Sequence, residues 1–199
     1  MQLDTQGTFK SPVLLETYLY VITAVYRGKL HGTILKIFWF KLKKMQASEI
    51  IEREVKEYFE GTDGFLVNIK SGNGKKIQVF VDRMGKNIAV DDCVALSRKI
   101  EAVLDESGLV SENYNLEVSS PGMDNAFNVF EQFEKNTGRN VVVLMLDGIK
   151  IEGVLKNPSR ESFTIEEHRV IKKKQAPEII EHTLKYDEVK SVKKKINFK

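Results

Sequence analysis

The segment around Pro121 and Gly122 constrains the fold more than any other part of the sequence. Proline has no backbone N–H to donate to a β-ladder, and glycine readily adopts the left-handed backbone of a tight turn. We therefore expect the strand-like residues 114–118 to end just before Pro121 and the chain to change direction there. Helix-like patterns and short strands lie upstream, whereas strand-like patterns rich in lysine lie downstream. The sequence thus predicts two unlike halves.

Charge is distributed unevenly along the chain. The net charge is +3, but residues 1–44 carry +5, residues 45–126 carry −6 and residues 127–199 carry +4. An acidic region followed by a basic one indicates that the basic region faces a polyanion. The single cysteine excludes an intramolecular disulfide and is too few for a structural zinc site. We therefore expect a cytoplasmic protein.

Residues 1–44 differ in pattern from the rest. Their apolar run at residues 13–26 is shorter than the about 20 residues that span a bilayer, and no signal-peptide cleavage pattern follows it. A surface anchor at residues 13–40 is one interpretation, although the apolar positions follow no helical stripe. We favour a mis-assigned start, with Met45 as the true first residue and residues 1–44 as an extension.

Residues 45–124 are predicted to form an αββαβ domain. The first helix is expected to begin at Ser48 as its N-cap and to stop at Gly61. Residues 65–69 and 77–81 are predicted to form a β-hairpin, because a glycine-containing turn joins them. The apolar stripe of the first helix consists of Ile51, Val55, Tyr58 and Phe59.

A second helix is predicted between Asp91 or Asp92, as its N-cap, and Gly108. A right-handed crossover through this helix would place residues 114–118 parallel to one strand of the hairpin. Cys93 lies on the apolar stripe, which predicts a buried and unreactive thiol. The stripe consists of Cys93, Leu96, Ile100, Val103 and Leu104.

Residues 125–199 are predicted to form a second, all-β domain, so the fold class is α+β. The strand-like segments are too few and too short for a two-sheet sandwich, whereas a small closed barrel of the SH3 or Sm type would leave no exposed edge. Before them, Phe127, Phe130 and Phe133 are expected to form one short apolar edge. The predicted strands are residues 140–146, 149–156, 162–171, 179–186 and 189–198.

No motif in the sequence indicates catalysis. The three histidines have no metal-ligand spacing, Ser119–Ser120 lack the G-x-S-x-G pattern of a serine nucleophile, and Gly72 and Gly74 lack a phosphate-loop lysine. Helix capping explains Asp91–Asp92 without a divalent ion. We therefore predict no enzymatic activity, no cofactor and no metal site.

Lysines cluster in the last third of the chain. Such clusters bind phosphates through Coulomb attraction and counterion release, but lysine also protects exposed strand edges against pairing. Charge alone fits both interpretations. The cluster consists of Lys172, Lys173, Lys174, Lys185, Lys190, Lys193, Lys194, Lys195 and Lys199.

The residues Leu116-Glu117-Val118-Ser119-Ser120-Pro121-Gly122 resemble the signature of the bacterial ribosome maturation factor RimP family. Comparable features follow at Gly138-Arg139, at Gly153-x-Leu155 and at residues 187–190. The resemblance implies an αββαβ domain, an Sm-like barrel, no enzymatic activity, and binding to the free small (30S) ribosomal subunit during its assembly. It also implies contacts with 16S rRNA and, through the barrel, with ribosomal protein twelve of that subunit.

The resemblance also suggests roles for particular residues. Arg139 joins the lysines as a candidate for RNA contact. The family commonly continues its signature with Leu-Asp-Arg-Pro, whereas residues 123–126 read Met-Asp-Asn-Ala, so a looser hinge is expected. The residues expected to set the interdomain geometry are Glu117, Ser119, Ser120, Pro121, Gly122 and Asp124.

Under this interpretation the protein is a monomeric assembly chaperone with no small-molecule substrate and no membrane partner. A different class of function is an Sm-like RNA-binding regulator of small or messenger RNA, which ring formation and tight binding to short single strands would favour. A third is a peripheral membrane protein anchored by residues 13–40, which requires that the mature chain begin at Met1.

Overall fold

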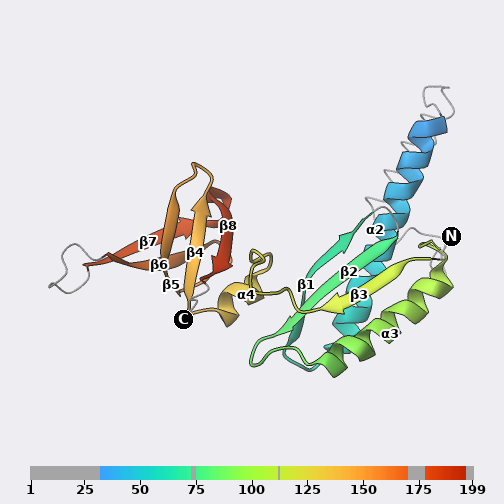
Figure 1. Ribbon diagram of the computed structural model, residues 1–199, viewed down its shortest axis with the longest axis horizontal. Helices are drawn as coiled ribbons and strands as arrows, with labels where there is room; N and C mark the ends of the chain where they lie inside the picture. Colours follow the sequence, from blue (N-terminus) through green and yellow to red (C-terminus); the bar gives the residue numbers. More distant parts are fainter. Residues whose placement is uncertain (1–31, 73–74, 112, 170–177, 196–199) are drawn as a thin grey trace, which may run out of the picture. The chain divides into compact units, whose positions relative to one another are not determined.

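The computed structural model describes residues 32–72, 75–111, 113–169 and 178–195 (Figure 1). The chain divides into two compact units, Met1–Gln46 and Ala47–Lys199. Apart from the first part of helix α2, every described element belongs to the second unit. The predictions for residues 13–26 and for Lys172–Lys174 lie outside the described residues. No helix in the described part is both long and apolar enough to cross a membrane.

Helix α2 (Gly32–Tyr58) is longer than the sequence pattern predicts. The prediction that Ser48 caps it is wrong, because the helix begins at Gly32 and Ser48 lies inside it. No proline or glycine interrupts the residues after Gly32, so the chain has no local reason to start the helix later. The end is close to the predicted position, and Gly61 adopts the left-handed conformation at φ +71°.

A three-stranded sheet accompanies α2 and confirms the predicted αββαβ order. Strands β1 (Gly64–Ser71) and β2 (Lys76–Arg83) are antiparallel, and β3 (Asn115–Ser119) is parallel to β2. Helix α3 (Val90–Ser107) makes the crossover, and the strand order is β1-β2-β3 (Figure 1). The hairpin and the parallel pairing are therefore both confirmed.

The core of this region lies between the sheet and the two helices. Ile77, Val79 and Val81 alternate along β2, so they project from one face of the sheet. Both helices pack on that face, because their buried residues belong to the same cluster. The helical members of the cluster are Ala47, Ile51, Val55 and Phe59 of α2 and Leu96, Ile100 and Leu104 of α3.

The start of α3 differs from the prediction. Ala89 is the N-cap, so the assignment of that role to Asp91 or Asp92 is wrong. Asp92 instead accepts two hydrogen bonds from the Arg83 guanidinium at 3.1 and 3.0 Å, and a longer one from the Ala89 N–H at 3.4 Å. Cys93 is only half-buried, and burial raises the pKa of its thiol.

The second sheet contains the five predicted strands. They are β4 (Asn140–Met145), β5 (Lys150–Lys156), β6 (Ser162–Arg169), β7 (Glu178–Lys185) and β8 (Val189–Lys194), all paired antiparallel in the order β7-β6-β5-β4-β8. A Cβ atom on Gly153 would collide with the Glu166 carbonyl oxygen, so glycine permits the close approach of β5 and β6.

A short helix, α4 (Phe130–Lys135), precedes this sheet and was not predicted. The spacing of Phe127, Phe130 and Phe133 indicated only an apolar edge, and a helix of six residues carries too little periodicity to be recognised. The Phe133 ring is buried, with its centroid 5.1 Å from that of Phe163 and 5.0 Å from that of Tyr186. The rings therefore attach α4 to the sheet.

The strand order requires the second sheet to curl. Strands β7 and β8 lie at opposite ends of the order, yet only the 3₁₀ turn η1 (Tyr186–Glu188) connects them. A connection of three residues must bring the two edges of the sheet close together. No ladder joins β7 to β8 among the residues described, so closure of the sheet into an SH3-like or Sm-like barrel stays a prediction.

Candidate functional site

The predicted interdomain segment forms the end of β3 and a turn. Glu117 accepts a hydrogen bond from Gln78 Nε2 at 2.8 Å and pairs with Lys76 at 3.0 Å. Hydrogen bonds from Lys76 and then Gln78 lower the pKa of the Glu117 carboxyl. β3 ends at Ser119, as the proline predicts, and Pro121 is buried. Glu117 therefore adds an exposed side-chain contact to the ladder between β3 and β2, and the turn follows directly.

The turn itself has an exposed surface. Ser120 and Asp124 are exposed, and Gly122 has φ +71°, which favours glycine. The Asn125 side-chain amide donates to the Pro121 carbonyl oxygen across the turn. Asn125 stands where the family commonly has arginine, so in this chain the position contributes a neutral hydrogen bond within the turn.

Hydrogen bonds also hold the residues that follow the turn. The Phe127 N–H donates to the Val192 carbonyl oxygen at 2.8 Å, which joins this segment to β8. The Asn128 N–H donates to Gln132 Oε1 at 2.7 Å, and the Gln132 side chain is buried in the first turn of α4. The expectation of a looser hinge is untested. The end of the connection is nevertheless held by hydrogen bonds from its backbone N–H groups to β8 and to α4.

A buried ion pair links β2 to α4. Lys135 Nζ lies 2.6 Å from Asp82 Oδ1, and the two side chains are 5% and 9% exposed. Lys135 Nζ also donates to the Lys86 carbonyl oxygen at 3.2 Å. Sequence reasoning missed this pair, because 53 positions separate its members and neither lies in a motif. It is the most buried ion pair of the described residues, and it joins the first sheet to the helix before the second.

The basic candidates do not form one uniform surface. Lys190 and Lys193 are exposed on β8 and have no ion-pair partner in the part of the chain that the structure describes. Arg139, just before β4, is exposed as well. Lys195 is different, because it pairs with Glu152 at 2.8 Å. Lys185, at the end of β7, is exposed and has no ion-pair partner among the described residues either, so four of these cations are free to contact a phosphate, and Lys195 is partly neutralised.

Lys194 lies in a less exposed position than its neighbours. Burial lowers the pKa of its ammonium group, the nearby charges of Lys135 and Arg139 lower it further, and Asp82 opposes this effect. Lys194 pairs in register with the buried Val141, so its side chain starts on the inner side of the sheet. It therefore shares an environment with the buried ion pair and is a weaker candidate for phosphate contact.

The histidines of the second sheet lie beside carboxylates. His182 Nε2 is 2.9 Å from Glu167 Oε2, and His168 Nε2 is 2.7 Å from Glu166 Oε1. These contacts lower the pKa of each glutamate. Within the described ranges, no group of three or more His, Cys, Asp or Glu side chains is placed to hold a metal ion. Pairing on the sheet surface accounts for both histidines.

Comparison with known proteins supports the resemblance seen in the sequence. A family model described as the RimP N-terminal domain matches residues 49–124. Curated proteins from two strains of Porphyromonas gingivalis, each named ribosome maturation factor RimP, are 33% identical over 146 residues. The alignment covers 71% of this chain and 93% of each relative. The chain belongs to the RimP family.

The family match includes some of the candidate residues and ends before others. The RimP N-terminal match ends at Asp124, so it includes the whole signature and the turn that follows β3. It also includes Asp82 but not Lys135. The buried ion pair therefore connects the matched segment to the residues that follow it.

Proposed function

We propose that the protein is a ribosome maturation factor that binds the free small (30S) ribosomal subunit and assists its maturation without catalysing a reaction. The observation that carries this proposal is the alignment with the two RimP relatives over nearly their whole length. The proposed contacts are 16S rRNA and ribosomal protein twelve of the small subunit. The proposed place of action is the cytoplasm.

The exposed basic residues suggest how RNA is bound. Lys190 and Lys193 on β8, and Arg139 just before β4, are exposed without carboxylate partners in the described structure. Cations of this kind contact phosphates with a strong dependence on salt and little dependence on base sequence. Such contacts would position the protein on the subunit, whereas the acidic region at residues 45–126 would set its orientation.

The proposal includes a division into an αββαβ domain at residues 45–124 and an Sm-like barrel domain at residues 125–199, acting as a monomer. Two separate clusters of buried residues support the division. The three-residue connection between the two edge strands supports closure of the second sheet, because it brings those edges together. Pairing between β7 and β8 would remove both edges.

A genetic experiment tests the proposed function. Deletion of the gene in the source organism should raise the ratio of free small subunits to assembled ribosomes in sucrose gradients and should leave 16S rRNA precursors unprocessed. A plasmid copy of the wild-type gene should restore both profiles. Normal gradients together with normal 16S processing in the deletion strain would contradict the proposal.

A further inference from the structure

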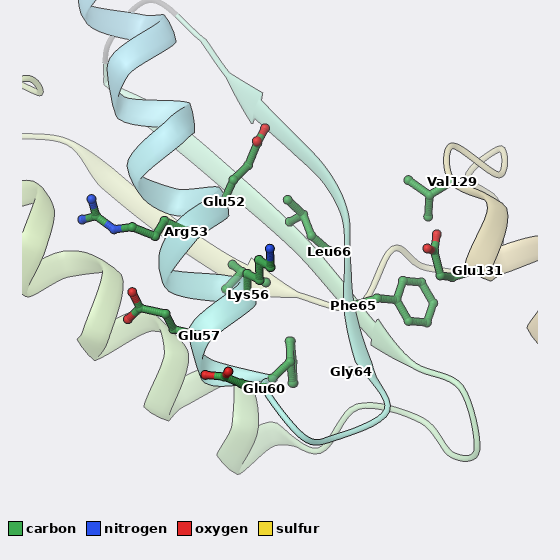
Figure 2. Close-up of a pocket in the computed structure, with 12 residues that line it drawn as sticks. Glu52, Arg53, Lys56, Glu57, Glu60, Gly64, Phe65, Leu66, Val129 and Glu131 are labelled. Carbon is green, nitrogen blue, oxygen red and sulfur yellow. The ribbon is translucent and has the colours of Figure 1, made fainter. Parts of the chain in front are cut away.

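A groove runs between α2 and the start of β1. Its volume is about 760 Å³, and its walls come from the last two turns of α2, from Phe59 and Glu60 just after the helix, and from Gly64, Phe65 and Leu66 of β1. Val129 and Glu131 complete the lining. Figure 2 shows Leu66 directed from β1 toward the helix, and Phe65 on the side of Val129 and Glu131. This volume is within the range of protein pockets that bind ligands.

The floor of the groove is apolar and fixed. Val55 and Phe59 are 1% and 5% exposed, and both belong to the core of the first sheet. Gly64 permits this packing, because a Cβ atom there would collide with the Phe59 ring. Leu66 and Phe65 are half-buried and extend the apolar surface. Phe65 and Leu66 therefore supply the accessible apolar surface, and the buried Val55 and Phe59 support it from below.

The rim of the groove is acidic. Glu52, Glu60 and Glu131 line it, and none of them has an ion-pair partner among the described residues. Lys56 is the one lining cation that is also unpaired there, because Arg53 pairs with Glu54. Glu57 is already neutralised by Lys99 at 3.1 Å. The unpaired charges of the rim therefore sum to a negative value.

The groove is also accessible from the edge of the sheet. β1 is an edge strand whose one ladder partner in the described structure is β2. A β-bulge between Leu66 and Asn68 interrupts the regular edge beyond the groove. An occupant can therefore lie beside α2 and β1 without displacing a strand.

We propose that this groove docks a basic peptide segment of a partner protein, with an apolar side chain on Phe65 and Leu66 and cationic side chains at Glu52, Glu60 and Glu131. Charge complementarity selects this occupant, because a nucleic acid would meet unpaired carboxylates and the surrounding residues 45–126 carry −6. The inference does not depend on the proposed function, since it uses a surface remote in sequence from the lysines of β8.

Titration of the isotope-labelled full chain with an octapeptide, Lys-Thr-Lys-Val-Lys-Thr-Lys-Val, tests the proposal by NMR. Amide shifts should concentrate at residues 52–60 and 64–66. A peptide with glutamate in place of lysine should not bind, and a peptide with serine in place of valine should bind more weakly. Shifts centred on another surface, or equal binding of the lysine and glutamate peptides, would overturn the proposal.

Two pairs of substitutions make the test specific. Glu52→Lys with Glu60→Lys should weaken the lysine peptide about tenfold, because the rim charge is reversed. The matched control, Glu49→Lys with Glu106→Lys, changes the net charge equally at exposed positions outside the groove and should have a much smaller effect. If both variants lose the same affinity for the lysine peptide, long-range attraction explains the binding. That outcome would overturn the proposal.

The same samples test two other occupants of the groove. A single-stranded RNA that shifts the groove amides more than the lysine peptide does would assign the groove to nucleic acid. Sedimentation of the peptide-free protein as a dimer, with the same amides protected from exchange, would assign it to a second copy of this chain. Either result would contradict the proposal.

Discussion

Both sheets have aliphatic cores, but a charge network borders the core of the first, whereas a group of aromatic rings packs into the core of the second. In the first, Arg83 donates to Asp92 and to Asp63, and its guanidinium lies 5.3 Å from the centre of the Phe59 ring. In the second, the rings of Phe133, Phe163 and Tyr186 contact one another. Polar contacts therefore connect β2 to α3 and to the residue before β1, whereas the ring cluster connects α4 to β6 and η1.

The two regions should therefore respond differently to substitution. Removal of one member of a partly exposed charge network should lower the free energy of unfolding only modestly. A buried ring leaves a cavity that its surroundings fill only partly. The buried pair of Asp82 and Lys135 combines a charged contact with deep burial, so it should behave more like a core residue.

The largest effect is expected for Phe163→Ala. Phe163 has no exposed surface, and its removal should lower the free energy of unfolding by about 4 kcal/mol. Chemical denaturation followed by circular dichroism measures the loss. Phe130→Ala, at a half-buried ring that stacks with Arg160, is the matched control and should cost much less. Equal losses would contradict an aromatic core centred on Phe163.

Lys135→Met should cost about 3 kcal/mol, because it leaves the Asp82 carboxylate buried without its cation. The double variant Asp82→Asn with Lys135→Met should recover part of this loss, because no uncompensated charge remains. A double-mutant cycle from denaturation curves measures the coupling. Additive losses would show that the two side chains do not interact in solution.

Arg83→Met should lower the free energy of unfolding by about 2 kcal/mol, because it removes charge-assisted hydrogen bonds to Asp92 and Asp63. Lys76→Met, which breaks an exposed pair with Glu117, is the control and should change stability little. If both variants unfold at the same denaturant concentration, the Arg83 network does not stabilise the first region.

Lys190→Ala with Lys193→Ala should change RNA binding without changing stability, because both side chains are exposed. If each lysine contacts one phosphate, the slope of log affinity against log salt should decrease by about 1.5–2. Fluorescence anisotropy with a structured RNA measures this slope. Lys75→Ala with Lys86→Ala, also exposed, is the control; an identical slope in both variants would remove β8 from the RNA contact surface.

The smallest effect concerns the loss of folding stability at acidic pH. Hydrogen bonds from Lys150 and then Lys195 lower the pKa of Glu152 from 4.5 to about 2. Because the folded-state pKa lies below the unfolded value, ionised Glu152 stabilises the fold above pH 4.5, and this contribution is lost as the pH falls toward 2. NMR titration should show the low pKa. Lys150→Met with Lys195→Met should raise it, and an unchanged pKa would contradict the pairing.

The two regions also differ in what the sequence predicts. Periodicity identified the hairpin and the helix of the crossover, and the crossover rule gave the parallel pairing of β3 with β2. Turn residues separated the five strands of the second sheet. These features depend on local patterns, which the sequence contains explicitly.

The missed features depend on contacts between distant residues. Asp92 lies within the first turn of α3, where it accepts hydrogen bonds mainly from Arg83 and a longer one from the N-cap N–H, and α4 is held by rings from other elements. Lys135 gave no signal because its partner, Asp82, lies 53 positions away. Arg139, Lys190 and Lys193 stay candidates because exposure shows access to a phosphate without identifying the RNA.

The proposed binding to the small subunit is tested by co-sedimentation of the full chain with free small subunits, with assembled ribosomes and with an unrelated structured RNA, each across a salt series. We expect selective retention on free small subunits that persists at physiological salt. Equal and steeply salt-dependent retention on all three would contradict it, because the lysines would then be a general polyanion-binding surface.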